Sequence, residues 1–223
     1  MNNISFLTTN FNEDILTKCA IASLNKYCNI PGVIIDNSDK TPIDPELYKY
    51  YTIMNNSFHK LIPDYKQGSK NHCASIDYAL KNYIKTKYVL LFDCDILFGP
   101  NIIQLLKTFE QYDAIGKVCW DDAPPVRLIP YMCIFNVEKM KQENISYFDN
   151  DRCIGPNSIT YDLCGPNTKN WFYDTGASFY EDIKDSWNIN NIDIGKYCVH
   201  MKGALNCNRD YRGWLNFYRL LWM

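Results

Sequence analysis

The chain has 223 residues and is 47% hydrophobic and 22% charged, which is typical of a globular protein with one sizeable core. Its net charge of −2 argues against a generally basic surface, so we expect no nucleic-acid partner. No stretch approaches the roughly eighteen unbroken apolar residues of a membrane span. The start, "MNNISFLTTNF", lacks the basic and apolar regions of a secretory signal, so we expect a cytoplasmic protein.

The first half of the chain alternates apolar strands with amphipathic helices. The expected strands are 3–9, 32–36, 49–55 and 88–95, and the expected helices are 12–27, 69–87 and 101–112. Such alternation predicts an α/β fold with a mostly parallel central sheet and helices on both faces.

The second half is less regular. Residues 126–141 resemble a strand that enters a short helix, and 149–170 are rich in loop formers. A helix can start at Asp174, and 189–204 read as a strand and then a loop. Because no linker or repeat is visible, we expect a single domain over 1–223, with a regular half (about 1–118) and a loop-rich half (about 119–223).

The ten cysteines form no CxxC pair and are scattered through apparently regular segments. Since a disulfide framework requires a secreted protein, we interpret them as reduced and mostly buried thiols.

Two aspartates interrupt the apolar run "KYVLLFDCDILFG", at Asp93 and Asp95. Residues two apart on an extended segment point the same way, so these carboxylates would repel each other unless a cation lay between them. Oxygen ligands favour Mg²⁺ or Mn²⁺, which keep positions open for phosphate oxygens. In a doubly wound sheet, ligands bind beyond the carboxyl ends of the strands. The alternative is a strand that ends in two turn-forming aspartates.

Several segments together resemble the GT-A-fold nucleotide-sugar glycosyltransferases, in particular the inverting family-two-like group with its DxD motif. They are "ISFLTTNFNEDIL", "VIIDNS", "NHCASIDYALKNYIKTKYVLLFDCDILF", "YDTGASFYEDI" and "VHMKGA". The resemblance is good from about Ile4 to Lys117 and thinner from Arg127 to Ala204. It implies a GT-A-like, Rossmann-like fold, in which residues of about 1–118 form the nucleotide-binding half and those of about 119–223 the acceptor half.

The resemblance also implies a nucleotide site. Thr9 and Phe11 match the end of the first strand, which holds the base, and Asp36, with Asn37 beside it, matches the residue that hydrogen-bonds uracil or ribose. The structural alternatives are that Thr9 and Phe11 end a strand and pack the core, and that Asp36 begins a turn.

The start of the helix before the aspartates lies over the nucleotide in this family, so Lys70 and His72 are candidates. The alternatives are a solvated lysine and a helix-surface histidine. The first aspartate, Asp93, would touch ribose and metal, and Asp95 would bind the metal. A late histidine often completes the metal site, and His200 matches it, with a core histidine as the alternative.

Inverting transfer needs a carboxylate base near the acceptor hydroxyl. Our candidate is Asp174, which follows the aromatic residues 171–173 and precedes Thr-Gly. The alternative is that Asp174 only caps a helix. Glu181 and Asp182 are weaker candidates, and Arg127 is a candidate near the sugar or the diphosphate.

The C-terminal segment "GWLNFYRLLWM" is aromatic and apolar on one helical face. It either packs on the domain, contacts a membrane surface peripherally through Arg209, Arg212 and Arg219, or forms a homodimer interface.

These residues favour a glycosyltransferase that depends on Mn²⁺ or Mg²⁺ and transfers a sugar, with UDP-sugar as the donor, to a glycan or another hydroxyl acceptor. One alternative is a sugar-phosphate nucleotidyltransferase, although "TTNFNE" lacks the glycines of a phosphate loop. The other is an inactive glycan- or nucleotide-binding module of the same fold.

Overall fold

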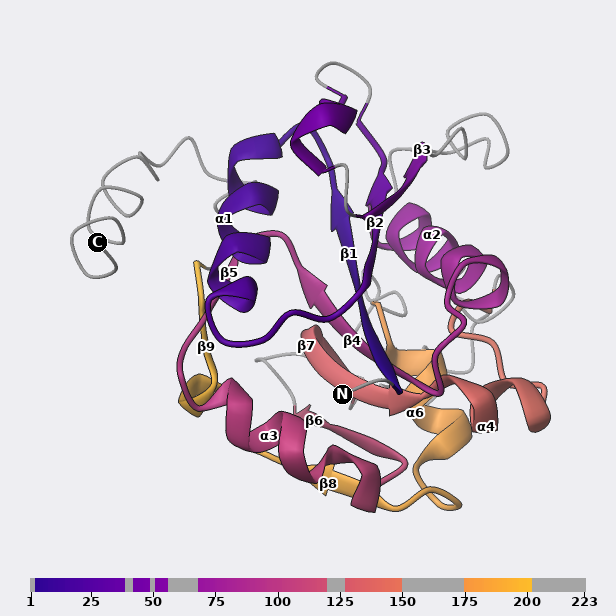
Figure 1. Ribbon diagram of the computed structural model, residues 1–223. Helices are drawn as coiled ribbons and strands as arrows, with labels where there is room; N and C mark the ends of the chain where they lie inside the picture. Colours follow the sequence, from indigo (N-terminus) through magenta and orange to yellow (C-terminus); the bar gives the residue numbers. More distant parts are fainter. Residues whose placement is uncertain are drawn as a thin grey trace, which may run out of the picture.

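The computed structural model describes residues 3–38, 42–48, 51–55, 68–119, 127–149 and 175–201 (Figure 1). The strands are β1 (Ile4–Asn10), β2 (Gly32–Asp36), β3 (Thr52–Asn55), β4 (Tyr88–Asp93), β5 (Ile96–Phe98), β6 (Ala114–Cys119), β7 (Arg127–Asn136), β8 (Ile189–Asn191) and β9 (Cys198–His200). The α-helices are α1 (Asp14–Asn25), α2 (Gly68–Asn82), α3 (Ile102–Thr108), α4 (Val137–Gln142) and α6 (Ala177–Ile183). Short 3-10 helices are η1 (Pro45–Tyr48), η3 (Phe109–Gln111) and η5 (Ile194–Lys196).

A seven-stranded sheet forms the centre of the described part of the chain, in the order β3-β2-β1-β4-β7-β6-β8. The pairs β3–β2, β2–β1, β1–β4 and β6–β8 are parallel, whereas β7 is antiparallel to both of its neighbours. The mostly parallel sheet is therefore confirmed, and β7 is the strand that runs against the others. Strand β1 is buried along its whole length, as expected for a strand covered on both faces.

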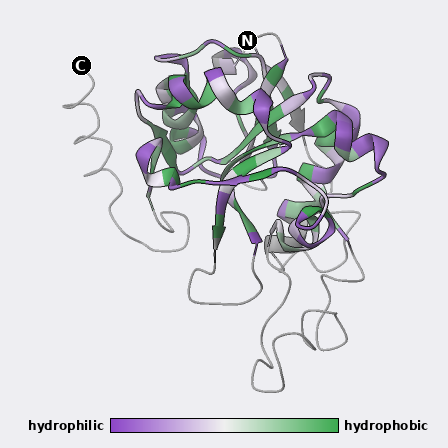
Figure 2. Cartoon of the chain, turned by 90° about the horizontal axis from the view of Figure 1, so that it is seen from below, coloured by the Kyte–Doolittle hydropathy of each residue, from purple (hydrophilic) through white to green (hydrophobic). Residues whose placement is uncertain are grey.

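Helices cover both faces of this sheet, as the alternation of elements predicted (Figure 1). On one face, Leu24 of α1 and Leu105 of α3 belong to one apolar cluster. On the other face, Leu80 of α2, Met140 of α4 and Phe179 of α6 belong to a second cluster. Hydrophobic residues concentrate in the strands between these layers (Figure 2). We name the first cluster, which includes α1 and α3, the α1-side core, and the second the α2-side core.

A second, two-stranded sheet pairs β5 with β9 beside α1 (Figure 1). It is tied to α1 by a buried hydrogen bond, in which Phe98 N donates to Ser23 Oγ over 2.9 Å. This small sheet matters for function because it joins the segment after β4 to a segment about a hundred residues later.

Several sequence expectations differ from the structure. The expected helix 69–87 ends at Asn82, and 189–204 contains β8, η5 and β9 instead of one strand. Residues 88–95 are not one strand, because β4 ends at Asp93 and the chain turns before β5. Strand β6 was not expected at all. Helix α6 starts at Ala177, three residues after Asp174, because Gly176 has a φ of 84° and lies outside helical geometry. The N-cap of α6 is Gly176.

The cysteines in the described part of the chain agree with the expectation. Six are free thiols, and five of these are buried: Cys28, Cys73, Cys94, Cys133 and Cys198. None of the helices in the described ranges has the length and apolar composition needed to cross a bilayer.

Candidate metal centre

Asp93 and Asp95 lie where the chain leaves the main sheet. Asp93 is the last residue of β4, the middle strand of the seven, and Asp95 immediately precedes β5. The Asp93 side chain is 26% exposed, and the Asp95 side chain is 6% exposed. The two carboxylates converge because the chain turns between two sheets, rather than because one strand continues through both residues.

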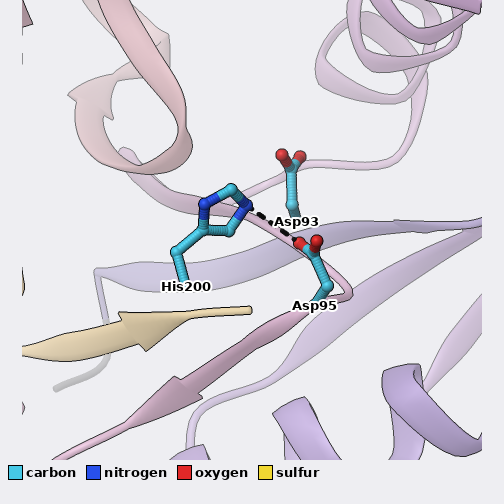
Figure 3. Close-up of side chains that lie close together, drawn as sticks. All are labelled: Asp93, Asp95 and His200. Carbon is cyan, nitrogen blue, oxygen red and sulfur yellow. Dashed lines mark ion pairs between the residues drawn. The ribbon is translucent and has the colours of Figure 1, made fainter. Parts of the chain in front are cut away.

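The small sheet brings His200 to the same place. His200 of β9 pairs with Ile96 of β5, and Met201 N donates to the backbone oxygen of Asp95 over 2.9 Å. The imidazole Nε2 of His200 lies 3.2 Å from Asp95 Oδ1 (Figure 3). The predicted association of His200 with the aspartate pair is thus present in the fold, since strand pairing fixes its backbone next to theirs.

One ligand atom from each of Asp93, Asp95 and His200 lies within 4.8 Å of the others. Atoms that share one divalent ion at 2.0–2.2 Å must lie about 3–4.4 Å apart, so this spacing fits a common ion after small side-chain adjustments. Two carboxylates and one imidazole are a donor set that Mn²⁺ accepts, and they leave coordination positions for other oxygens. The residues therefore fit a divalent metal ion.

Cys94, between the two aspartates, does not fit the same role. It is buried, and burial together with the neighbouring charges of Asp95 and Asp93 raises the pKa of its thiol well above the ordinary value, against a hydrogen bond with Thr17 that lowers it. A raised pKa disfavours the thiolate that metal binding requires, so Cys94 fits the role of a small core residue.

Two of the predicted nucleotide-site residues lie against Asp93. His72, in the first turns of α2, places Nε2 at 2.9 Å from Thr9 Oγ1, at the end of β1. The same nitrogen is 3.7 Å from Asp93 Oδ1. The carboxyl ends of β1 and β4 and the start of α2 therefore meet beside the candidate metal centre.

Asp36 and Asn37 lie at the end of β2 and are both buried. The Oδ1 atom of Asp36 accepts hydrogen bonds from Asn10 Nδ2 and Ser38 N, and Oδ2 accepts one from Ile43 N. In this structure Asp36 anchors the loop that follows β2, and its contact with a nucleotide stays a prediction.

Phe11 is 48% exposed, which is unusual for a large apolar side chain, and it directly follows the buried β1. The next residue, Asn12, has a φ of 59°, a left-handed conformation that turns the chain sharply there. Phe11 is therefore half exposed beyond the carboxyl end of β1, which argues against the alternative that it packs in the core.

Arg127 begins β7 and pairs with Cys119 at the end of β6. Its charge acts on the buried Tyr147: burial is the main cause that raises the pKa of Tyr147, the charge of Asp93 adds to it, and Arg127 opposes it. Arg127 and Asp93 thus lie near one tyrosine. Three predicted features lie outside the described part of the chain: the side chain of Lys70, Asp174 and the C-terminal aromatic segment.

Comparison with solved structures finds the same architecture in glycosyltransferases. The mannosyltransferase PcManGT from Pyrobaculum calidifontis, in complex with GDP-Man and Mn²⁺, matches 95% of this chain and 59% of its own chain with a TM-score of 0.60 at 11% identity. The galactosyltransferase LgtC, in complex with donor and acceptor sugar analogues, matches 85% of this chain and 73% of its own with a TM-score of 0.54 at 12% identity. This chain has the GT-A fold.

The GT-A fold class is therefore confirmed, while the sequence itself matches no protein family and no curated protein. TarS 1–349 from S. aureus is also similar, with a TM-score of 0.49 at 14% identity over 67% of this chain. This GT-A chain spans about half of that protein, 51% of its length.

Proposed function

We propose that this protein is a metal-dependent glycosyltransferase that moves a sugar from a nucleoside diphosphate, with UDP-sugar as the donor, to a hydroxyl of a glycan or glycoconjugate. The observation that carries the proposal is the convergence of Asp93, Asp95 and His200 after the middle strand of a GT-A sheet. The Mn²⁺ and GDP-Man in the mannosyltransferase complex, and the donor and acceptor analogues bound to LgtC, support it.

A divalent ion, Mn²⁺ or Mg²⁺, would be held by Asp93, Asp95 and His200. When bound, it supplies positive charge next to the leaving diphosphate. The chain's own contribution is to hold these three donors at the end of β4, directly before β5 and on β9, which pairs with β5. His72, which is hydrogen-bonded to Thr9, lies next to Asp93 and would hold the Asp93 side chain in place.

For the nucleotide, we propose that the exposed ring of Phe11 and the Thr9 segment contact the base, and that Asp36 and Asn37 contact uracil or ribose. Asp36 would also shape the loop that its carboxylate anchors. Lys70 and Arg127 would add positive charge near the diphosphate. In this proposal the residues up to about 118 bind the donor and those from about 119 bind the acceptor.

A thermal-shift panel tests the donor and the metal together. A ligand that binds only the folded state at about 100 times its Kd should raise the Tm by about 5–10 °C in a chain of this size. We expect this rise with UDP plus Mn²⁺, little rise with UDP alone, and smaller rises with GDP or CDP. Asp95→Ala should remove the Mn²⁺-dependent part, whereas Asp185→Ala, at an exposed position on the segment after α6, should keep it.

If GDP or CDP with Mn²⁺ stabilises the protein and UDP does not, the UDP assignment is wrong. If no nucleotide gives a Mn²⁺-dependent rise, the metal-dependent transferase proposal is wrong as a whole.

The proposed base is tested by Asp174→Asn. Because the amide cannot accept a proton from the acceptor hydroxyl, we expect transfer to fall by at least about 100-fold while the UDP and Mn²⁺ thermal shift stays unchanged. Transfer is measured as nucleotide release with a panel of sugar acceptors. Full transfer by this variant would exclude Asp174 as the base.

A further inference from the structure

A tyrosine that the sequence did not single out stacks on the candidate metal ligand His200. The ring of Tyr131, on β7, lies parallel to the imidazole, with ring centroids 4.2 Å apart and planes 2° apart. The other side of the histidine is directed at the aspartates, since Nε2 lies 3.2 Å from Asp95 Oδ1. The imidazole is thus fixed by a flat aromatic face and by a carboxylate.

A regular strand would not place Tyr131 there. Successive side chains of a strand point to opposite faces, and Met132 belongs to the α1-side core while Cys133 belongs to the α2-side core. Tyr131 should therefore point to the α2 side, yet it packs against the α1-side core, together with its neighbour Met132. That core includes Cys198 of β9, two residues before His200.

A bulge in β7 explains this change of direction. Gly116 pairs with Cys133 and Val118 pairs with Leu128, so Lys117 of β6 faces residues 129–132 of β7. The inserted stretch contains Pro130, which has no N–H to donate to a neighbouring strand. Bulges of this kind bend a strand and re-aim side chains.

Crowding at Gly116 shows how closely β6 follows the bulged strand. A Cβ at Gly116 would lie 2.8 Å from Leu128 Cδ1 and 3.0 Å from Cys133 Cβ, on either side of the inserted stretch. The bulge is therefore packed into the fold between two regular pairs, rather than being a frayed end.

We propose that the β7 bulge exists to aim Tyr131 at His200, and that Tyr131 is a positioning residue that holds the imidazole in its metal-binding orientation. This rests on the metal centre proposed above. Tyr131 would not touch the ion itself. It restricts rotation of the imidazole, so that His200 does not have to be ordered when the ion binds. Outer partners of metal ligands typically contribute 10–100-fold to metal affinity.

The test compares Tyr131→Phe with Tyr131→Leu, because phenylalanine keeps the aromatic face and leucine keeps only apolar bulk. Mn²⁺ affinity is measured by calorimetry on metal-free protein. We expect Tyr131→Phe to bind within about twofold of wild type and Tyr131→Leu to bind about 10-fold more weakly. In Co²⁺-loaded protein the visible absorption bands, which report ligand geometry, should change in Tyr131→Leu and be preserved in Tyr131→Phe.

The matched control is Tyr112→Leu, because Tyr112 is also partly buried against the α1-side core but lies after η3, away from the histidine. It should lose a similar amount of thermal stability and keep the wild-type Mn²⁺ affinity. Equal weakening in Tyr112→Leu and Tyr131→Leu would mean that general loosening of the core, rather than the stack, lowers affinity, and would overturn the proposal.

A measurement on the wild type does not depend on how the variants fold. The chain has three histidines, so their ring protons can be assigned by NMR with His200→Ala. The ring current of Tyr131 should shift the His200 ring protons upfield, and Tyr131→Phe should keep the shift. Unshifted His200 protons, or wild-type Mn²⁺ affinity in Tyr131→Leu, would overturn the role of Tyr131 alone. Absence of Mn²⁺ binding to the wild type would overturn the metal centre and this role with it.

Discussion

At the scale of single residues, Asn10 stabilises the carboxyl end of β1, next to the candidate site. Its side chain is fully buried at the end of β1. Its Nδ2 donates to Asp36 Oδ1 and Ser38 Oγ, and its Oδ1 accepts from Thr17 Oγ1 and Glu13 N. A side-chain amide offers two donor hydrogens and two acceptor lone pairs, so all of its bonding capacity is used. Asn10 thereby connects β1, the start of α1 and the loop after β2.

We expect Asn10→Ala to lower the free energy of unfolding by about 3 kcal/mol, because several buried groups lose their partner at once. Urea unfolding followed by circular dichroism measures the loss. The matched control is Asn101→Ala, whose Nδ2 makes one exposed hydrogen bond to Lys196 O, and which should cost below about 1 kcal/mol. Equal losses in the two variants would mean that the hydrogen bonds of Asn10 stabilise the fold no more than the single exposed bond of Asn101.

At the scale of elements, the start of α6 depends on one glycine. Gly176 has a φ of 84°, and a Cβ there would lie 2.8 Å from Leu128 O and 3.2 Å from the Tyr147 hydroxyl. Both a left-handed backbone and close contact with β7 thus favour glycine. This residue fixes how α6 enters the fold next to the start of β7, and it follows the proposed base by two residues.

We expect Gly176→Ala to destabilise the protein by about 2 kcal/mol, from backbone strain and from the clash with Leu128. Gly99→Ala is the control, because a Cβ at Gly99 would meet its nearest atom, Tyr197 O, at an ordinary 3.5 Å. Differential scanning calorimetry should show a Tm lower by about 4–8 °C for Gly176→Ala. If both variants have the Tm of the wild type, the strain argument at Gly176 is wrong.

At the scale of the whole molecule, Asp113 ties together elements from separate parts of the second half. Its Oδ2 accepts hydrogen bonds from Lys139 Nζ of α4 over 2.7 Å and from Asn188 N, before β8, over 3.0 Å. Burial alone would raise the pKa of this carboxyl, but these bonds and the charge of Lys139 outweigh burial and lower the pKa below its ordinary value of 3.8.

Because this pKa is lowered in the folded state, part of the folding stability depends on pH. A carboxyl with a lower pKa in the folded state stabilises the fold above its ordinary pKa, and this stabilisation is lost as the pH falls through the folded value. We therefore expect Asp113→Asn to be less stable than wild type at pH 5–7, and the difference to shrink as the pH falls below 3.8. Urea unfolding at several pH values measures it, with the exposed Asp185→Asn as a control for charge. A difference that is constant down to pH 2 would contradict the linkage.

Much of this architecture was predictable because it follows from the hydrophobic pattern of short segments. Apolar runs such as 32–36 and 88–92 marked strands buried on both faces, and helical spacing marked α1, α2 and α3. Asp93 and Asp95 were recognisable because charged residues at the end of an apolar strand are costly without a partner. Thr9 and Phe11 were proposed from the resemblance to the GT-A family, and their contact with a nucleotide stays a prediction.

Other features had no local signal. The position of β7 between β4 and β6, against the direction of the other strands, cannot be read from its apolar sequence, since many neighbours would bury it equally well. The hydrogen bonds of the Asp36 carboxylate with Asn10 and Ile43 were not predicted, because they join residues that are far apart in the sequence or lie in a loop without a regular pattern. A buried asparagine at a strand end was the available signal for Asn10.

The sequence by itself determined the alternation of strands and helices in the first half, the burial of the central strands and the two carboxylates at and just after the end of the middle one, because periodicity and hydrophobicity act over a few residues. The tertiary structure alone decided which distant groups meet there. Pairing of β5 with β9 brings His200 to Asp95, and the bulge in β7 turns Tyr131 onto His200. These contacts depend on the packing of segments far apart in the chain, which no local pattern specifies.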